Sequence, residues 1–415
     1  MSGQRLSMLS LLCAVSLSIP LAAQGAGLGA RLPSQRSLNR YGLTRAWWNV
    51  ATMDPLRDKV AHLVADEDTV YVQSTSGIMT AFDAETGKKL WAILLGSGED
   101  PGFPVSSNAE TALVATGTTL YSVDKRSGGI TWQLKLPQTP STSPAVDSEQ
   151  VYIGSLDGSV YAFDLRKIHK LYSQGRLPQW SYQALSWRYK APKEITTPPL
   201  SNGRIVNFAS RAGLLYGVSV KSEGGLVFQR ESVDRKPVSA PIKASADYLY
   251  MASRDFNVYC INRNTGTTKW EFPSGRPIEQ APYVIGRHVF VLPTRGGLFC
   301  LNSDTGDRIW HQPKIKRFLA ATPSIVYTAD SFHNVILLAR GSGQILGALP
   351  LGDYKIQLSN DQTDRLFVCT ERGLVICVRE RRRPFPLYYQ HPERKPILPD
   401  FSPGPPPSAK PPTPN

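Results

Sequence analysis

The sequence predicts an all-β fold, an eight-bladed β-propeller, from three observations. A unit of strand, tight turn and strand recurs along the 415-residue chain, and a bulky aromatic residue closes it about every 40 residues. Each unit has room for about four short strands, as a propeller blade requires. A further tryptophan-containing strand lies near the N-terminus, where it can complete the last unit.

Residues 70–91 (VYVQSTSGIMTAFDAETGKKLW) show the unit most clearly. Two segments in it alternate branched and aromatic residues, a pattern typical of a pleated, half-buried strand. Gly77 and Gly87 fall at the turns, where glycine adopts a positive φ without steric cost. Trp91 ends the unit as a large apolar side chain that can be buried between blades.

The unit recurs with varying regularity. Clear copies occupy residues 120–132, 151–164, 249–270 and 289–310, and degenerate copies occupy residues 205–228, 324–346 and 366–380. One interval is longer because the third unit carries an insertion, residues 167–189, that is rich in basic and aromatic residues. We expect this insertion to pack as a loop on the propeller, with partner binding as the alternative.

The two ends of the chain complement each other. The last copy, residues 366–380, lacks an outer strand, and the segment Leu43–Val50 (LTRAWWNV) lacks a partner. Pairing them would close the ring and remove two exposed sheet edges. We therefore expect eight blades closed by the N-terminal strand, with seven blades as the alternative if the two strands do not pair.

The repeat resembles the motif A-x-D-x-x-T-G-x-x-x-W of the pyrroloquinoline-quinone (PQQ) repeat superfamily. The resemblance covers residues 43–380, and asparagine replaces the aspartate in two copies. The signature positions are Asp83, Gly87, Trp91, Asp124, Gly128, Trp132, Asp164, Asn262, Gly266, Trp270, Asn302, Gly306 and Trp310. The resemblance implies the propeller fold, and it extends to the branch of non-catalytic outer-membrane assembly propellers (BamB-like).

Four regions are expected along the chain. Residues 1–25 are typical of a secretory signal peptide, with Arg5 before an apolar run, and a signal anchor is the alternative. A leader (residues 26–39), the propeller (residues 40–380) and a basic, proline-rich, disordered tail (residues 381–415) follow. We expect export to the periplasm, the cell envelope or the exterior, as a monomer without a membrane span.

Charge and cysteine content suggest the partners and the redox state. The formal net charge is +14, which favours an envelope protein, an anionic surface or an acidic glycan as partner, and we expect no nucleic acid. Three of the four cysteines after the leader, Cys260, Cys300 and Cys377, occupy a position that other copies of the repeat fill with small residues, and neighbouring copies would lie too far apart for a disulfide. We therefore expect buried thiols at Cys260, Cys300, Cys369 and Cys377.

No motif for catalysis, cofactor binding or metal binding is found in the sequence. Adjacent cysteines, a G-x-S-x-G nucleophile elbow, a phosphate loop and zinc-ligand spacing are all missing, and the links between units are short. We therefore expect a non-catalytic interaction scaffold without a cofactor. The first alternative is a quinoprotein oxidoreductase with PQQ and calcium, which the resemblance also allows. The second is a propeller that binds a polysaccharide or a small ligand.

Basic residues recur where the second strand of a unit turns into the third. These turns share one face of a propeller with the links between blades, so we expect a basic rim as the candidate partner-binding face. Independent solvated charges are the alternative. The turn residues are Arg211, Arg254, Arg295 and Arg372, and the links add Lys193, Lys236, Lys243, Arg276 and Lys355.

Overall fold

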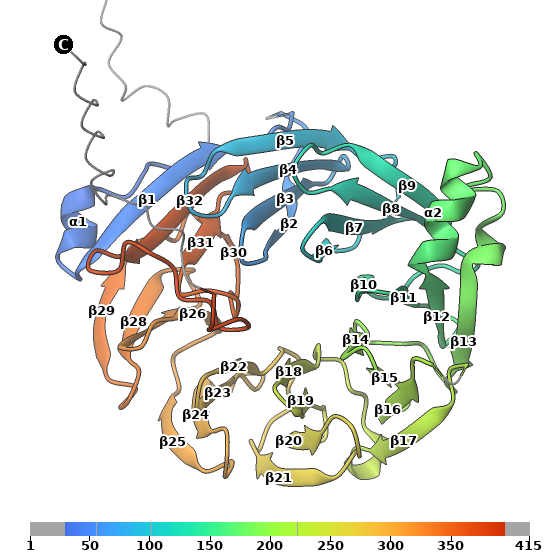
Figure 1. Cartoon of the computed structure of the whole chain (residues 1–415). Helices are drawn as coiled ribbons and strands as arrows, with labels where there is room; N and C mark the ends of the chain where they lie inside the picture. Colours follow the sequence, from blue (N-terminus) through green and yellow to red (C-terminus); the bar gives the residue numbers. More distant parts are fainter. Residues whose placement is uncertain (1–29, 55, 101, 222, 395–415) are drawn as a thin grey trace, which may run out of the picture.

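The structure, a computed structural model, describes residues 30–394 except residues 55, 101 and 222. Eight four-stranded antiparallel sheets surround a central axis (Figure 1), which confirms the eight-bladed propeller. The expected signal peptide, residues 1–25, lies outside the described residues. Within the described part, none of the helices combines the length and the apolar composition that crossing a bilayer requires.

Blades 1 to 4 take their strands in chain order from the axis outward (Figure 1). Blade 1 consists of β2 (Val60–Ala65), β3 (Thr69–Ser74), β4 (Ile78–Asp83) and β5 (Lys89–Leu94). Blade 2 consists of β6 (Ser106–Ser107), β7 (Thr111–Thr116), β8 (Thr119–Asp124) and β9 (Ile130–Lys135). Blade 3 consists of β10 (Ala145–Val146), β11 (Gln150–Gly154), β12 (Ser159–Asp164) and β13 (Leu185–Lys190). Blade 4 consists of β14 (Leu200–Ser201), β15 (Ile205–Ser210), β16 (Leu214–Ser219) and β17 (Leu226–Glu231).

Blades 5 to 7 follow the same order, and blade 8 takes its outer strand from the N-terminal end. Blade 5 consists of β18 (Lys243–Ser245), β19 (Tyr248–Ala252), β20 (Asn257–Asn262) and β21 (Thr268–Pro273). Blade 6 consists of β22 (Tyr283–Ile285), β23 (His288–Val291), β24 (Leu298–Asn302) and β25 (Arg308–Gln312). Blade 7 consists of β26 (Arg317–Ala321), β27 (Ile325–Ala329), β28 (Val335–Ala339) and β29 (Ile345–Leu349). Blade 8 consists of β30 (Ile356–Gln357), β31 (Leu366–Cys369), β32 (Leu374–Glu380) and β1 (Leu43–Val50).

In most blades, a closing aromatic residue packs on a turn glycine of the next blade. The Trp91 indole of blade 1 lies against Gly128 of blade 2, so close that a Cβ there would sit 2.5 Å from the ring. Its Nε1 donates a hydrogen bond of 2.8 Å to the carbonyl oxygen of Lys125. The same aromatic-on-glycine contact pairs Trp187 with Gly224, Phe228 with Gly266, Trp270 with Gly306, and Trp310 with Gly343. The turn glycine is therefore needed for its missing side chain as well as for its positive φ.

The N-terminal strand closes the ring as the sequence predicts. β1 pairs antiparallel with β32, from Leu43 opposite Glu380 to Val50 opposite Leu374. Trp47 then takes the closing role for blade 8, because its ring lies against Gly87 of blade 1 and its Nε1 donates to the carbonyl oxygen of Ala84 at 2.9 Å. Blade 7 lacks a closing aromatic residue on β29, and the ring of Tyr41 packs on Gly347 instead.

The third blade carries the inserted segment. It forms helix α2 (Leu165–Ser173) and the 3-10 turn η2 (Ser181–Ala184) at the rim of the ring (Figure 1). Ile168 and Leu171 are buried in a cluster with residues of blades 2 and 3, so the insertion is packed on the propeller. Two further short helical segments are α1 (Gln35–Asn39) in the leader and η3 (Val233–Arg235) in a link.

The segment after β32 crosses one face of the ring. We call residues 384–394 the strap. The Leu387 N–H donates to Asp364, and the Tyr389 hydroxyl donates to the carbonyl oxygen of Ala321 at 2.5 Å. Residues 381–394 fall in the region expected to be disordered, yet they are packed, because these groups bond to the end of β26 in blade 7 and to the loop before β31 in blade 8. Residues 395–415 lie outside the described residues.

Candidate functional site

The predicted arginines all lie on one face. We call it the link face, because it carries the turns between second and third strands together with the links between blades. Backbone hydrogen bonds join these two sets: the Arg211 N–H donates to the carbonyl oxygen of Glu194 at 2.9 Å, and the Arg254 N–H donates to that of Pro237 at 3.2 Å. The opposite face, which carries the strap, is called the strap face.

The arginines do not form one continuous basic patch. Arg211 and Arg254 are paired with glutamates of the neighbouring links, Arg211 with Glu194 at 2.5 Å and Arg254 with Glu279. Arg295 and Arg372 are exposed in blades 6 and 8. Of the link cations, Lys193, Lys236 and Arg276 are exposed, and Lys355 pairs with Glu371 at 3.4 Å. The link face therefore carries both ion-paired cations and cations that are simply exposed.

Lys243 departs from the expected basic rim. It begins β18, the innermost strand of blade 5, and its Nζ lies 2.5 Å from the carboxylate of Asp361 in blade 8. The long loop before β31 carries Asp361 past blade 7, where the Asn360 N–H donates to the carbonyl oxygen of Leu319 at 2.6 Å. Sequence reasoning assigned Lys243 to the link face because the reach of this loop is not visible in the repeat.

Sequence analysis missed the exposed apolar side chains of the link face. In the ring as described, the other exposed large apolar residues lie on outer strands, in the insertion or on the strap. Those of the link face lie in turns or links, and they are Leu56, Leu156, Val233, Phe256 and Phe332. Leu56 is 92% exposed and Phe332 is 75% exposed. Apolar side chains beside ion-paired arginines have the composition of a protein-binding surface.

Phe256 occupies a turn position that glycine fills in four other blades. Those glycines, Gly77, Gly158, Gly213 and Gly373, all have positive φ. Phe256 has a φ of +76°, which costs free energy for a residue with a bulky side chain. The Ser274 N–H at 2.8 Å and the Ser274 hydroxyl at 2.7 Å both donate to the Phe256 carbonyl oxygen and hold the turn. The phenylalanine in a glycine position was the sequence signal for this surface.

A pocket of about 310 Å³ opens on the link face between blades 1 and 2. Gln73 and Thr116 of the inner strands line it, together with Leu95, Glu99 and Asp100 of the link. The two carboxylates make this side of the face acidic, whereas Arg295 lies on the other side of the ring, in blade 6. The link face thus presents charges of both signs to a partner.

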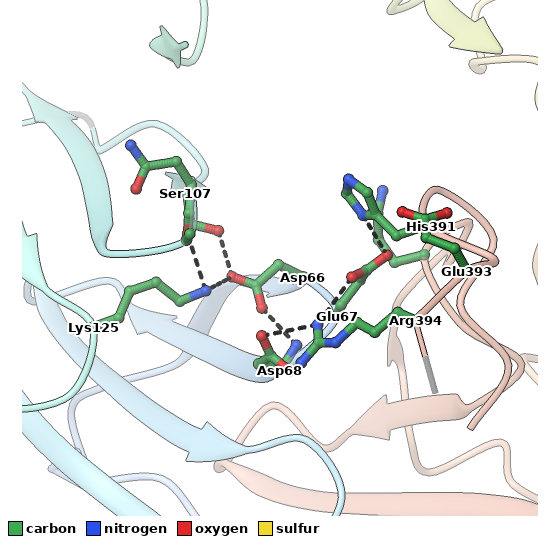
Figure 2. Close-up of a pocket in the computed structure, with 11 residues that line it drawn as sticks. Asp66, Glu67, Asp68, Ser107, Lys125, His391, Glu393 and Arg394 are labelled. Atoms are coloured by element: carbon green, nitrogen blue, oxygen red, sulfur yellow. Dashed lines mark hydrogen bonds and ion pairs between the residues drawn. The ribbon is translucent and has the colours of Figure 1, made fainter. Parts of the chain in front are cut away.

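A second pocket, of about 450 Å³, lies on the strap face (Figure 2). Arg394 of the strap reaches Glu67 at 3.0 Å and Asp68 at 2.5 Å, and His391 bonds to Glu67 at 2.9 Å. The hydrogen bond to Asp68 raises the pKa of Arg394. Across the pocket, Lys125 pairs with Asp66 at 2.7 Å. The pocket's carboxylates are thus matched by cations of the same chain.

The described residues include no group of three or more His, Cys, Asp or Glu side chains placed to hold a metal ion. All four described cysteines are buried and unpaired, as the sequence predicts. Burial raises the pKa of Cys260 to about 11 and that of Cys300 to about 12, so neither is an activated nucleophile.

Sequence comparisons identify relatives along most of the chain. A family model described as outer membrane protein assembly factor BamB matches residues 75–186 and 218–353. The protein of that name from Bordetella pertussis is 22% identical over 330 residues, which cover 75% of this chain and 81% of the relative. Those from Burkholderia pseudomallei (21% identical; 65% of this chain, 75% of the relative) and Yersinia pestis (22%; 76% and 72%) match as well.

Solved structures share the fold. The crystal structure of BamB from Moraxella catarrhalis has a TM-score of 0.63 and 18% identity, and the match covers 82% of this chain and 98% of the other. The computationally designed Ika8 protein has a TM-score of 0.59 and 15% identity, with 77% and 96% covered. At these identities the structures show the fold alone, and the family assignment rests on the sequence match, which spans more than half of the residues. The chain belongs to the family of outer membrane protein assembly factor BamB.

Proposed function

We propose that this protein is a non-catalytic interaction scaffold of the cell envelope, which docks a protein partner of outer-membrane protein assembly through its link face. Family membership supports the process, because the relatives carry the name of outer membrane protein assembly factor. The expected signal peptide supports export. We expect this scaffold to use no cofactor.

One observation carries the choice of face: the exposed apolar side chains in turns and links gather on the link face. Leu156, Phe256 and Phe332 come from blades 3, 5 and 7, so they surround the axis on one side of the ring. Aromatic side chains and arginines are the residue types that most often dominate binding energy at protein interfaces. The neighbouring Arg211–Glu194 and Arg254–Glu279 pairs would form a polar rim.

A rescue experiment tests the proposal. In cells that lack this protein we expect reduced amounts of folded outer-membrane proteins, and the unchanged chain should restore them. A variant with Leu156→Asp, Phe256→Asp and Phe332→Asp should fail to restore them, because three charges are placed in the apolar part of the interface. The measurement is the amount of folded outer-membrane protein at equal expression.

The matched control carries aspartates at three exposed aromatic residues of the insertion, away from the link face: Tyr172→Asp, Trp180→Asp and Tyr182→Asp. This control should restore the outer-membrane proteins as well as the unchanged chain does. Equal rescue by both triple variants would refute the link face as the docking site. No defect in cells lacking the protein would refute the role in assembly.

A further inference from the structure

Arginines without an acidic partner gather where the ring closes. Arg40 caps the C-terminal end of α1, and Arg381 and Arg382 follow β32; all three are exposed. The Arg381 N–H donates to the carbonyl oxygen of Gly42 at 2.8 Å, which holds the two segments side by side. We call these three arginines the seam patch. Among residues 30–394 as described, none of the three forms an ion pair.

A pocket of about 390 Å³ lies at this seam. Arg381 and Arg382 line it together with Asn39, Tyr41 and Ser324, so its wall carries cations and neutral hydrogen-bonding groups. Glu380 also lines it and is the one carboxylate that could neutralise the arginines from within the pocket.

The carboxylate of Glu380 is already engaged by other groups. Its Oε1 accepts hydrogen bonds from Thr322 at 2.5 Å and from Ser324 at 3.0 Å. Its Oε2 accepts a hydrogen bond from Nε of Arg383 at 3.1 Å, so Glu380 forms its ion pair with Arg383, which is not part of the seam patch. The guanidinium groups of Arg381 and Arg382 are therefore left for a ligand from outside the chain.

The acidic part of the strap face lies in blade 1 and is partly offset by cations of the same chain. Glu67 and Asp68 of blade 1 are paired with Arg394, and Asp66 is paired with Lys125 (Figure 2). Arg394 of the strap thus offsets part of the negative charge of this turn, whereas the three arginines of the seam patch form no ion pair among the described residues. Phe385, at the start of the strap and three residues after Arg382 in the sequence, is an aromatic residue that is 44% exposed.

We propose that the seam patch and its pocket bind phosphate headgroups of an anionic membrane surface. The planar guanidinium fork matches a phosphate in two hydrogen bonds at once, which suits Arg381 and Arg382 to this ligand. Basic residues near an anionic bilayer add attraction, and an aromatic side chain favours the interface. The seam lies on the side of the ring opposite the link face. Membrane contact there would leave the link face free for its protein partner.

Vesicle flotation tests the proposal on the full chain. The vesicles are phosphatidylcholine alone or phosphatidylcholine mixed with phosphatidylglycerol, and a seam variant carries Arg40→Glu, Arg381→Glu and Arg382→Glu. The control variant carries the same change of charge on exposed arginines in blades 2, 3 and 4: Arg126→Glu, Arg188→Glu and Arg204→Glu. Thermal melting checks that both variants fold, which we expect because all six side chains are exposed.

We expect the unchanged chain and the control variant to float with anionic vesicles. The fraction of the seam variant that floats with these vesicles should be lower by about tenfold or more. The difference should vanish with neutral vesicles and shrink at high salt, because exposed charges are screened. Equal binding of the two variants to anionic vesicles would overturn the proposal. A second result would also overturn it: inorganic phosphate raises the melting temperature of the unchanged chain but not of the seam variant, and neither protein floats with anionic vesicles. The site would then bind a free anion and not a membrane surface. Neither result bears on docking at the link face.

Discussion

Phe256 shows how a single residue can be costly for folding and still be retained. Its φ of +76° is one that glycine adopts freely, and its side chain is 46% exposed, so little burial compensates the strain. A residue that stores strain at the surface is a candidate for binding. The same turn in blades 1, 3, 4 and 8 has glycine, which makes the substitution to glycine an informative one.

We expect Phe256→Gly to raise the free energy of unfolding by about 1 kcal/mol, because the strain at positive φ is removed. The same change should weaken partner binding, because the aromatic side chain is lost. Chemical denaturation measures the first effect, and an affinity measurement with the partner measures the second. Phe256→Ala, which keeps the strain and removes the ring, separates the two. A clear loss of stability in Phe256→Gly would contradict the strain argument.

Gly306 illustrates the opposite constraint, in which a side chain cannot be added. A Cβ at Gly306 would lie 2.7 Å from the ring of Trp270, and its φ is +80°. Because both a steric overlap and a strained backbone follow, we expect Gly306→Ala to cost about 2–4 kcal/mol in the free energy of unfolding. The control is Gly341→Ala in blade 7, where nothing lies within 4 Å of the added Cβ. Equal stability of the two variants, measured by denaturant unfolding, would show that the aromatic-on-glycine contact is unimportant.

The cysteines allow a test by chemical reactivity. Burial raises the pKa of Cys260 to about 11 and that of Cys300 to about 12, so few thiolates exist at pH 8 and reagents cannot reach them. In a Cys13→Ser variant, we expect a thiol reagent to modify none of the four remaining cysteines in the folded protein and all four after unfolding. Rapid modification of the native protein would contradict the burial of these four side chains in the blades.

The closing strand is the element on which the ring depends. In β1, successive side chains point to opposite faces, so Trp47 is buried at 7% exposure while Trp48 is 39% exposed. We expect Trp47→Ala to lower the free energy of unfolding by about 3–5 kcal/mol, because it leaves a cavity and removes the hydrogen bond to Ala84. Trp48→Ala, the neighbouring control, should cost far less. If both substitutions had the same small effect on thermal unfolding, β1 would not be the closing strand in solution.

Among the elements, those of the ring could be predicted and the additions to it could not. The strands and turns of each blade could be predicted because their residue pattern repeats along the chain. The pairing that closes the ring could be predicted because the segment Leu43–Val50 lacked a partner and the last unit lacked an outer strand. The strap was assigned to a disordered tail because its composition is rich in proline, and composition does not reveal that Leu387 and Tyr389 meet partners on blades 7 and 8. The helix α2 was likewise expected only as a packed loop.

For the whole molecule, the order of strands and turns was enough to predict which residues share the link face. The charge pairing and the apolar content of that face depend on three-dimensional contacts that the sequence does not show. The alternation of turns along the chain places Arg211, Arg254, Arg295 and Arg372 on the same face, so their gathering there follows from sequence. The pairing of Arg211 and Arg254 with link glutamates depends on how each link folds back over its blade, and that path has no repeat signal. The apolar component was missed because single exposed residues such as Leu156 and Phe332 look ordinary in a sequence.

The central claim is that the link face docks a protein of outer-membrane assembly. The most direct measurement places a photo-cross-linker at position 332 on the link face, and for comparison at position 204 on the strap face, in native envelopes. The account predicts a cross-link from position 332 to a component of the outer-membrane assembly machinery, and none to it from position 204. Cross-linking of that machinery from position 204 alone, or from neither position, would contradict the account.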